Sequence, residues 1–140
     1  MERARRGAGV PADKEGLRGV DVADLMRITE RRVGDIIVLK LAGRLELDAG
    51  DTVLRDYVNR LVEEGGIKLL LDLTDVVRMD SAGIGMLVGK YLTAKKRGGT
   101  IKLLHLTDRT SRLLNITKLA SVFEIFAEED QALASFGEGK

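Results

Sequence analysis

The chain has 140 residues, 44% hydrophobic and 32% charged, which is the composition of one globular domain and argues against disorder. Its 23 basic and 22 acidic residues nearly cancel, so no bulk charge draws it to nucleic acid or an anionic membrane. The lack of cysteine and the single histidine argue against disulfides and metal sites. Without a membrane-spanning apolar run or a signal-peptide core, we expect a cytoplasmic protein with no cofactor, metal, membrane or nucleic-acid partner.

Residues 1–25 differ in character from the rest of the chain. Glycines are scattered among alternating charges there, and no hydrophobic period is sustained, so we predict a flexible N-terminal extension over 1–25 and one domain over 26–140. Met26 opens the first patterned stretch, and a translation start at that position is a second interpretation of the same boundary. Two strands over 28–33 and 36–41, separated by a tight turn, then predict a hairpin.

The segments after the hairpin alternate between helix and strand. A helix is predicted after residues 43–48 because apolar residues recur at helical spacing, namely Val53, Leu54, Tyr57, Val58, Leu61 and Val62. The nearly continuous apolar run 69–77 is typical of a buried parallel strand. The later elements are a strand, a short helix, a strand and a terminal helix over 100–106, 107–117, 122–126 and 128–136. This order predicts an α/β fold with a mixed sheet of about five strands.

Ser81 stands where the buried strand stops and a helix starts. That helix is indicated by apolar residues at offsets of three and four, namely Ile84, Leu87, Val88, Tyr91 and Leu92. As the natural N-cap, Ser81 would hold its hydroxyl among unpaired N–H groups at the positive end of the helix dipole, where a phosphate is well tolerated. We interpret Ser81 as a candidate switch, and a purely structural cap is the alternative.

Three glycines follow this serine. Gly83 and Gly85 lower helix propensity in the first turn by about 1 kcal/mol each, so something other than helix stability favours them. We interpret them as leaving the hydroxyl accessible. Gly89 extends a track of small residues one turn further, which allows close approach of either the sheet or a partner.

A group of acidic residues follows the predicted hairpin. Glu46, Asp48 and Asp51 could cap the next helix. Alternatively, because loops leaving the carboxyl ends of parallel strands gather at one edge, they lie beside Asp80 and Ser81 in a recognition surface. A phosphate on that serine would then add repulsion sufficient to undo a docked complex.

Three enzymatic patterns fail at this segment. The glycines are out of step for a dinucleotide-binding fingerprint, and no G-K-[ST] sequence is present. A hydrolase elbow would need glycine where Met79 stands, and the sole histidine, His105, lies in a predicted strand. We therefore expect no enzymatic activity and interpret His105 as structural.

These residues resemble a known family, the bacterial anti-sigma-factor antagonists, whose fold is the STAS domain. The resemblance covers 28–136, in the strand-turn-strand opening and in the segments 41–46, 69–77, 79–85, 98–99 and 113–122. It implies a STAS-like mixed sheet with helices packed mainly on one face. It also implies that an anti-sigma factor with serine kinase activity phosphorylates Ser81 and that a PP2C-type phosphatase removes the phosphate.

In the cycle that the resemblance implies, the unphosphorylated protein binds the anti-sigma factor and frees sigma. Asp80 would help to place the hydroxyl, either Glu46 or Asp48 would take the family's acidic contact, and Ala82 leaves Ser81 as the only local acceptor. The expected contact surface comprises Glu46, Asp48, Asp51, Asp80, Ser81, Ala82, Gly83, Ile84, Gly85, Met86 and Gly89.

Two other functions are compatible with the same segment. In a STAS scaffold subunit of a stress-signalling or membrane transport complex, the helix after Ser81 would be a static docking surface. A pocket for a small molecule or nucleotide at the same edge is a third interpretation, which no sequence motif favours.

Overall fold

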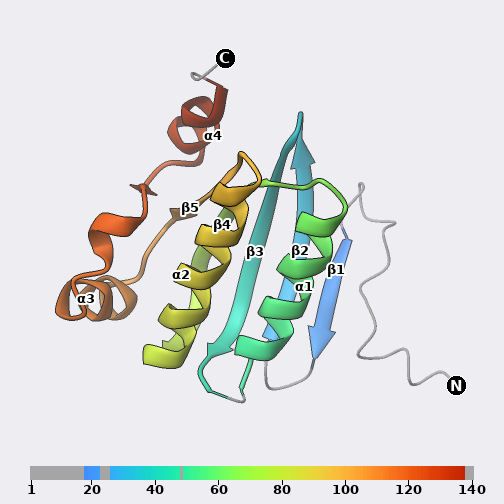
Figure 1. Ribbon diagram of the computed structural model, residues 1–140. Helices are drawn as coiled ribbons and strands as arrows, with labels where there is room; N and C mark the ends of the chain where they lie inside the picture. The colour runs from blue at the N-terminus through green and yellow to red at the C-terminus, as the bar shows by residue number, and fades with distance from the viewer. Residues whose placement is uncertain (1–17, 23–25, 48, 138–140) are drawn as a thin grey trace, which may run out of the picture.

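The computed structural model describes residues 18–22, 26–47 and 49–137, which form one six-stranded sheet with helices on both faces (Figure 1). The strands lie in chain order across the sheet, β1 to β6. β1–β2 and β2–β3 are antiparallel, and the remaining neighbours are parallel. The elements are β1 (Arg18–Val22), β2 (Met26–Val33), β3 (Ile36–Leu45), α1 (Asp51–Glu63), β4 (Lys68–Met79), α2 (Ser81–Lys96), β5 (Thr100–Leu104), α3 (Asp108–Ile116), a 3₁₀ turn (Ala120–Val122), β6 (Ile125–Phe126) and α4 (Glu129–Gly137).

The predicted mixed α/β sheet with an N-terminal hairpin is confirmed. Val33 pairs with Ile36 across the tight turn, and Gly34 adopts the positive φ of 62° that such a turn requires. β3 continues beyond the predicted strand as far as Leu45, and this added length carries it to the edge where α2 begins.

β1 lies within the segment predicted to be a flexible extension. It pairs with β2 along its whole length, and Gly19 approaches β2 so closely that a Cβ there would lie 1.6 Å from the Ile28 carbonyl oxygen. The hydrophobic pattern did not reveal this strand, because its sequence, RGVDV, contains only two apolar side chains. The sheet therefore starts before Met26, and residues 1–17 of the predicted extension lie outside the described residues.

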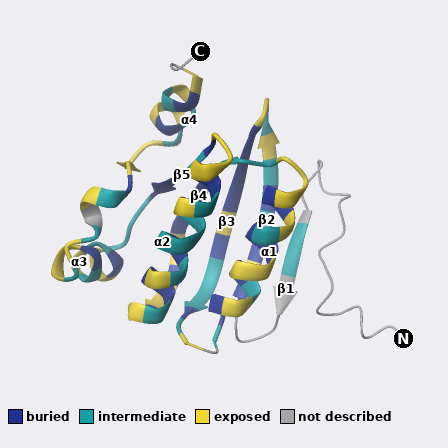
Figure 2. Cartoon of the chain, viewed as in Figure 1, coloured by how far each residue is buried: buried dark blue, intermediate teal, exposed yellow. Residues whose placement is uncertain are grey.

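Helices α1 and α2 lie side by side on one face of the sheet and α4 covers part of the other (Figure 1). Successive residues of β4 point to opposite faces of the sheet. Leu69 and Leu71 pack in the larger core beneath α1 and α2, and Leu70 packs in the smaller core beneath α4. Figure 2 shows the resulting band of buried residues along the central strands. Burial on both faces explains why this strand reads as a continuous apolar run.

A buried polar contact fixes α1 to the sheet. The Tyr57 hydroxyl on α1 donates to Glu30 Oε1 of β2 at 2.5 Å, and Arg32 Nε donates to the other carboxylate oxygen at 2.8 Å. Burial, together with this carboxylate, raises the pKa of Tyr57 above its ordinary value, so the phenol stays protonated and remains a donor. The predicted apolar stripe of α1 is confirmed around this contact.

Two predicted strand boundaries are wrong. The strand predicted over 122–126 comprises only Ile125–Phe126, because Ala120–Val122 form a 3₁₀ turn. β5 ends at Leu104 rather than at residue 106, because His105 takes a left-handed φ of 58° that interrupts the strand. Leu92, which the spacing placed on one face of α2 with Ile84 and Leu87, is 53% exposed. At 100° per residue, this position has rotated away from the face defined by Ile84 and Leu87. In the described residues, no helix is both long and apolar enough to cross a membrane.

Candidate functional site

The parallel pairing of β3 with β4 brings two loops together at one edge of the sheet. Leu45 and Met79 are the last paired residues of these strands, so the turn after β3 and the start of α2 leave the sheet side by side (Figure 1). The backbone N–H of Asp80 donates to the Leu45 carbonyl at 3.4 Å across this junction. The topology thus places the acidic turn beside the serine, as the sequence pattern indicated.

Asp80, and not Ser81, is the N-cap of α2. Its backbone is extended, with φ −124° and ψ −175°, and its carboxylate Oδ1 accepts the Gly83 N–H at 3.1 Å. Its Oδ2 accepts the Leu47 N–H, also at 3.1 Å. Aspartate suits the cap position because its two carboxylate oxygens accept hydrogen bonds from two backbone N–H groups, one in each loop. A serine hydroxyl at this position would accept from only one of them. Ser81 is therefore the first helical residue.

These backbone donors shift the protonation of Asp80. Burial acts to raise the pKa of Asp80, but hydrogen bonds from the backbone of Leu47, Gly83 and Ala82 outweigh burial and hold that pKa below its ordinary value. The folded state thus favours the carboxylate. Its contribution to stability is present above about pH 4, the ordinary pKa of aspartate, and is lost as the pH falls through the lower pKa of the folded protein.

The variant Asp80→Asn tests this carboxylate. Asparagine retains one oxygen for the Gly83 N–H but puts an amide NH₂ in place of the acceptor for Leu47, so we expect a loss of about 1 kcal/mol at pH 7. The difference from the unsubstituted protein should shrink as the pH falls below about 4. Urea unfolding at several pH values measures it, with Asp56→Asn, an exposed carboxylate on α1, as the matched control. A difference that stays constant with pH would contradict this role.

The Ser81 side chain is exposed at the N-terminus of a 16-residue helix. At this end of the helix, backbone N–H groups point outward and the dipole favours negative charge. The hydroxyl is thus accessible to another protein, and a phosphate placed there would lie in a favourable field.

The glycines of α2 divide into two kinds. Gly83 is buried, and a Cβ at this position would lie 2.1 Å from the Leu45 carbonyl oxygen, so the missing side chain allows α2 to approach β3. The interpretation that Gly83 leaves the Ser81 hydroxyl accessible is therefore wrong, because the space its missing side chain leaves is filled by β3. Gly85 and Gly89 have open space where a Cβ would be, so no side chains project from the outer face of the helix at these two positions. Ile84 is 1% exposed and cannot contact a partner as the sequence analysis expected.

The accessible part of the expected α2 surface is consequently smaller than predicted. Ser81 and Gly85 are exposed, while Ala82, Met86 and Gly89 are half-buried, and Met86 packs against the main core.

The acidic residues after β3 have local partners. Glu46 Oε2 accepts from Arg78 Nε at 3.1 Å, and the backbones of Glu46 and Ala49 exchange two hydrogen bonds that close a tight turn. Asp51 is buried in the first turn of α1, where its Oδ1 accepts the Thr52 N–H at 2.7 Å. The N-cap of α1 is Gly50 and no side chain caps the helix, so the expectation that Asp51 caps it is wrong; Asp51 lies in the first turn, where its charge interacts favourably with the helix dipole. Asp48 lies outside the described residues.

Leu47 is the residue that the sequence analysis missed. It lies in the turn closed by Glu46 and Ala49, and 65% of it is exposed although its backbone is tied to Asp80. The signal available in the sequence was a single apolar residue between two acidic residues, which indicates an exposed leucine in a turn. An exposed leucine beside an exposed serine offers a partner both an apolar contact and a modifiable group. In the described residues, no group of three or more histidines and carboxylates is placed to hold a metal ion.

Comparisons with known proteins agree with this geometry. Residues 27–132 match the family model of the STAS domain. The chain is 37% identical over 94 residues to the anti-sigma-B factor antagonist of Bacillus subtilis, covering 67% of this chain and 84% of that protein. It is 35% identical to the corresponding antagonist of Listeria monocytogenes, covering 69% and 83%. The crystal structure of an anti-sigma factor antagonist from Mycobacterium paratuberculosis has the same fold, with a TM-score of 0.71 at 20% identity, covering 84% and 98%.

Proposed function

Because the chain belongs to the STAS domain family, and its relatives in Bacillus and Listeria are anti-sigma factor antagonists, we propose that it is itself such an antagonist, controlled by phosphate on Ser81. In its unphosphorylated form it binds an anti-sigma factor and so releases a sigma factor. The observation that carries the proposal is the exposed Ser81 at the N-terminus of α2, beside a turn that Asp80 holds in place.

The proposed docking surface consists of Leu47, Ser81 and the outer face of the first turns of α2. Leu47 supplies exposed apolar area, and Gly85 and Gly89 leave room for a partner to approach the helix. With Ser81 near the centre of this surface, a change at its hydroxyl affects the whole contact.

Phosphorylation would act on binding more than on folding. A phosphate adds about −1.5 to −2 charges next to the carboxylates of Asp80 and Glu46, and this charge would face the partner. The helix N-terminus stabilises the same charge, so the domain stays folded. Repulsion and the cost of desolvating the phosphate then release the partner.

The proposed partners follow from this chemistry. An anti-sigma factor with serine kinase activity would transfer phosphate from ATP to the Ser81 oxygen, and a PP2C-type phosphatase would hydrolyse the ester. The chain is the substrate of both reactions rather than an enzyme. Ala82 carries no hydroxyl, so Ser81 is the only acceptor at this helix start. A cytoplasmic location goes with this role in transcription.

Incubation with the cognate anti-sigma factor and ATP tests the proposal. Intact mass should increase by one phosphate, and peptide mapping should place it on Ser81. Ser81→Ala should abolish the increment, whereas Ser121→Ala, which removes another exposed serine, should leave it unchanged. Stable binding of the anti-sigma factor without any phosphate transfer would instead indicate a static docking scaffold.

A further inference from the structure

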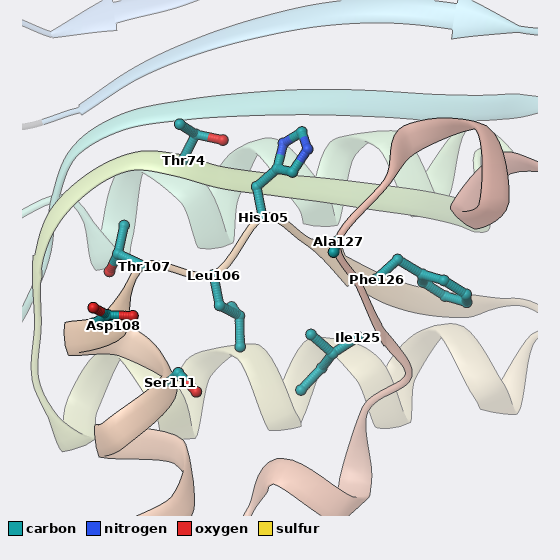
Figure 3. Close-up of a pocket in the computed structure, with 9 residues that line it drawn as sticks. All are labelled: Thr74, His105, Leu106, Thr107, Asp108, Ser111, Ile125, Phe126 and Ala127. Carbon is teal, nitrogen blue, oxygen red and sulfur yellow. The ribbon is translucent and has the colours of Figure 1, made fainter.

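A pocket separate from the proposed docking surface opens where β5 and β6 end, beside the middle of β4, with a volume of about 650 Å³ (Figure 3). Three segments line it: the middle of β4 just beyond its pairing with β5, the connection from β5 into α3 with the first turn of α3, and β6 with the residue after it. The lining residues are Thr74, His105, Leu106, Thr107, Asp108, Ser111, Ile125, Phe126 and Ala127. The carboxyl ends of parallel strands are a frequent location of ligand sites in α/β folds.

His105 holds a strained conformation at the wall of this pocket. Its φ of 58° is costly for a residue with a Cβ, and no helix ends there to account for it. By contrast Lys118, at φ 62°, directly follows α3 and its capping residue. The His105 backbone N–H donates to the Phe126 carbonyl at 2.9 Å, and its Nδ1 lies 3.3 Å from Asp72 Oδ1. These contacts fix the two sides of the pocket relative to each other.

The charge of the lining favours a cation over an anion. Asp108 is the lining carboxylate, and neither lysine nor arginine is among the lining residues. The start of α3, which could otherwise attract an anion, is already occupied: Thr107 and Thr110 form a reciprocal capping box. Lys102, whose Nζ is 5.9 Å from the Phe126 ring centroid, is buried and paired with Glu124 at 3.2 Å.

The rest of the lining combines apolar area with hydroxyl groups. Leu106 and Ile125 offer an apolar wall, and Ile125 is 38% exposed although it is a β-branched aliphatic residue within the sheet, whereas the Phe126 ring packs in the core beneath α4. Ser111 and Thr107 contribute hydroxyl oxygens near Asp108 (Figure 3). A wall that is apolar on one side and carries an acid with hydroxyls on the other matches an amphiphilic cation.

We propose that this pocket binds a small organic cation, namely an amine with an apolar body. The ammonium group lies near the Asp108 carboxylate and the Ser111 hydroxyl, and the apolar body lies against Leu106 and Ile125. This function is independent of Ser81 and uses none of the residues of the proposed docking surface.

Three probes that share one apolar body but differ in charge test the proposal: 2-phenylethylamine, 2-phenylethanol and phenylacetate. We expect the amine to cause saturable shifts of the backbone amides of residues 105–111 and 125–127 in ¹H–¹⁵N spectra of the full chain. The alcohol should bind several-fold more weakly, and phenylacetate should cause no saturable shift. Ala127→Trp, at an exposed lining position, should abolish the shifts by filling the pocket.

The contribution of the carboxylate is measured with charge variants. Asp108→Asn should weaken the amine about two- to fivefold, as expected for a solvent-exposed ion pair, while Asp56→Asn on α1 should leave its affinity unchanged. If Asp108→Asn disturbs α3, Ser111→Ala provides a second variant with the same expected direction. Equal binding of alcohol and amine, unchanged affinity in both pocket variants, or shifts confined to the Ser81 region would overturn the proposal.

Discussion

Replacing Gly83 with alanine is expected to destabilise the domain by about 3 kcal/mol, the upper part of the range for overpacking a core. The added Cβ would lie 2.1 Å from the Leu45 carbonyl oxygen and 3.0 Å from the Leu45 Cγ. Because the nearer atom belongs to the backbone of a central strand, the clash can be relieved only by moving α2 away from β3. Urea-induced unfolding of the variant and of the unsubstituted protein measures the loss.

Gly85 supplies the matched control for this substitution. It lies two residues further along the same helix, and nothing lies within 4 Å of the position that its Cβ would take. Gly85→Ala is therefore expected to stabilise the domain by about 0.5–1 kcal/mol through helix propensity alone. Equal effects of the two substitutions would show that α2 does not approach β3 as closely as described.

The second large effect is expected on partner binding at Ser81. Under the proposed function, Ser81→Ala should bind the anti-sigma factor as tightly as the unphosphorylated protein, since it removes only an exposed hydroxyl. Ser81→Asp should weaken binding by about tenfold or more, because it places a carboxylate at the centre of the docking surface beside Asp80. Titration calorimetry with the purified anti-sigma factor measures both affinities.

Folding and binding can be separated in this experiment. An aspartate at the first position of α2 interacts favourably with the helix dipole, so the stability of Ser81→Asp should not fall. Ser121→Asp adds the same charge at an exposed position on the 3₁₀ turn and should leave the affinity unchanged. Equal affinity of the anti-sigma factor for Ser81→Ala and Ser81→Asp would refute the electrostatic switch.

Much of the fold could be predicted because its strands and helices carry strong periodic signals. The hairpin joins two strand-like runs through a glycine turn, and the start of the run 69–77 is continuously apolar because residues 69–71 are covered on both faces of the sheet. β1 could not be recognised in the same way. A five-residue edge strand with two valines has no period that distinguishes it from a loop, and its position depends on pairing with β2.

The meeting of the two loops at one edge of the sheet was predicted, but its details were not. Parallel strands bring their carboxyl ends together, so the topology alone placed Glu46 near Ser81. The choice of Asp80 as cap depended on a second donor, the Leu47 N–H, which comes from 33 residues away in sequence and is visible only in three dimensions. Gly83 had two interpretations that only the distance to Leu45 could separate.

The double hydrogen bonding of Asp80 has a consequence for recognition. Since one side chain restrains both the Leu47 turn and the first turn of α2, these two segments are preorganised before any partner arrives. Under the proposed function, an incoming protein loses little conformational entropy in ordering the loop that it contacts, and more of the contact energy remains available as affinity. A rigid recognition element of this kind favours discrimination between partners by small chemical differences rather than by induced fit.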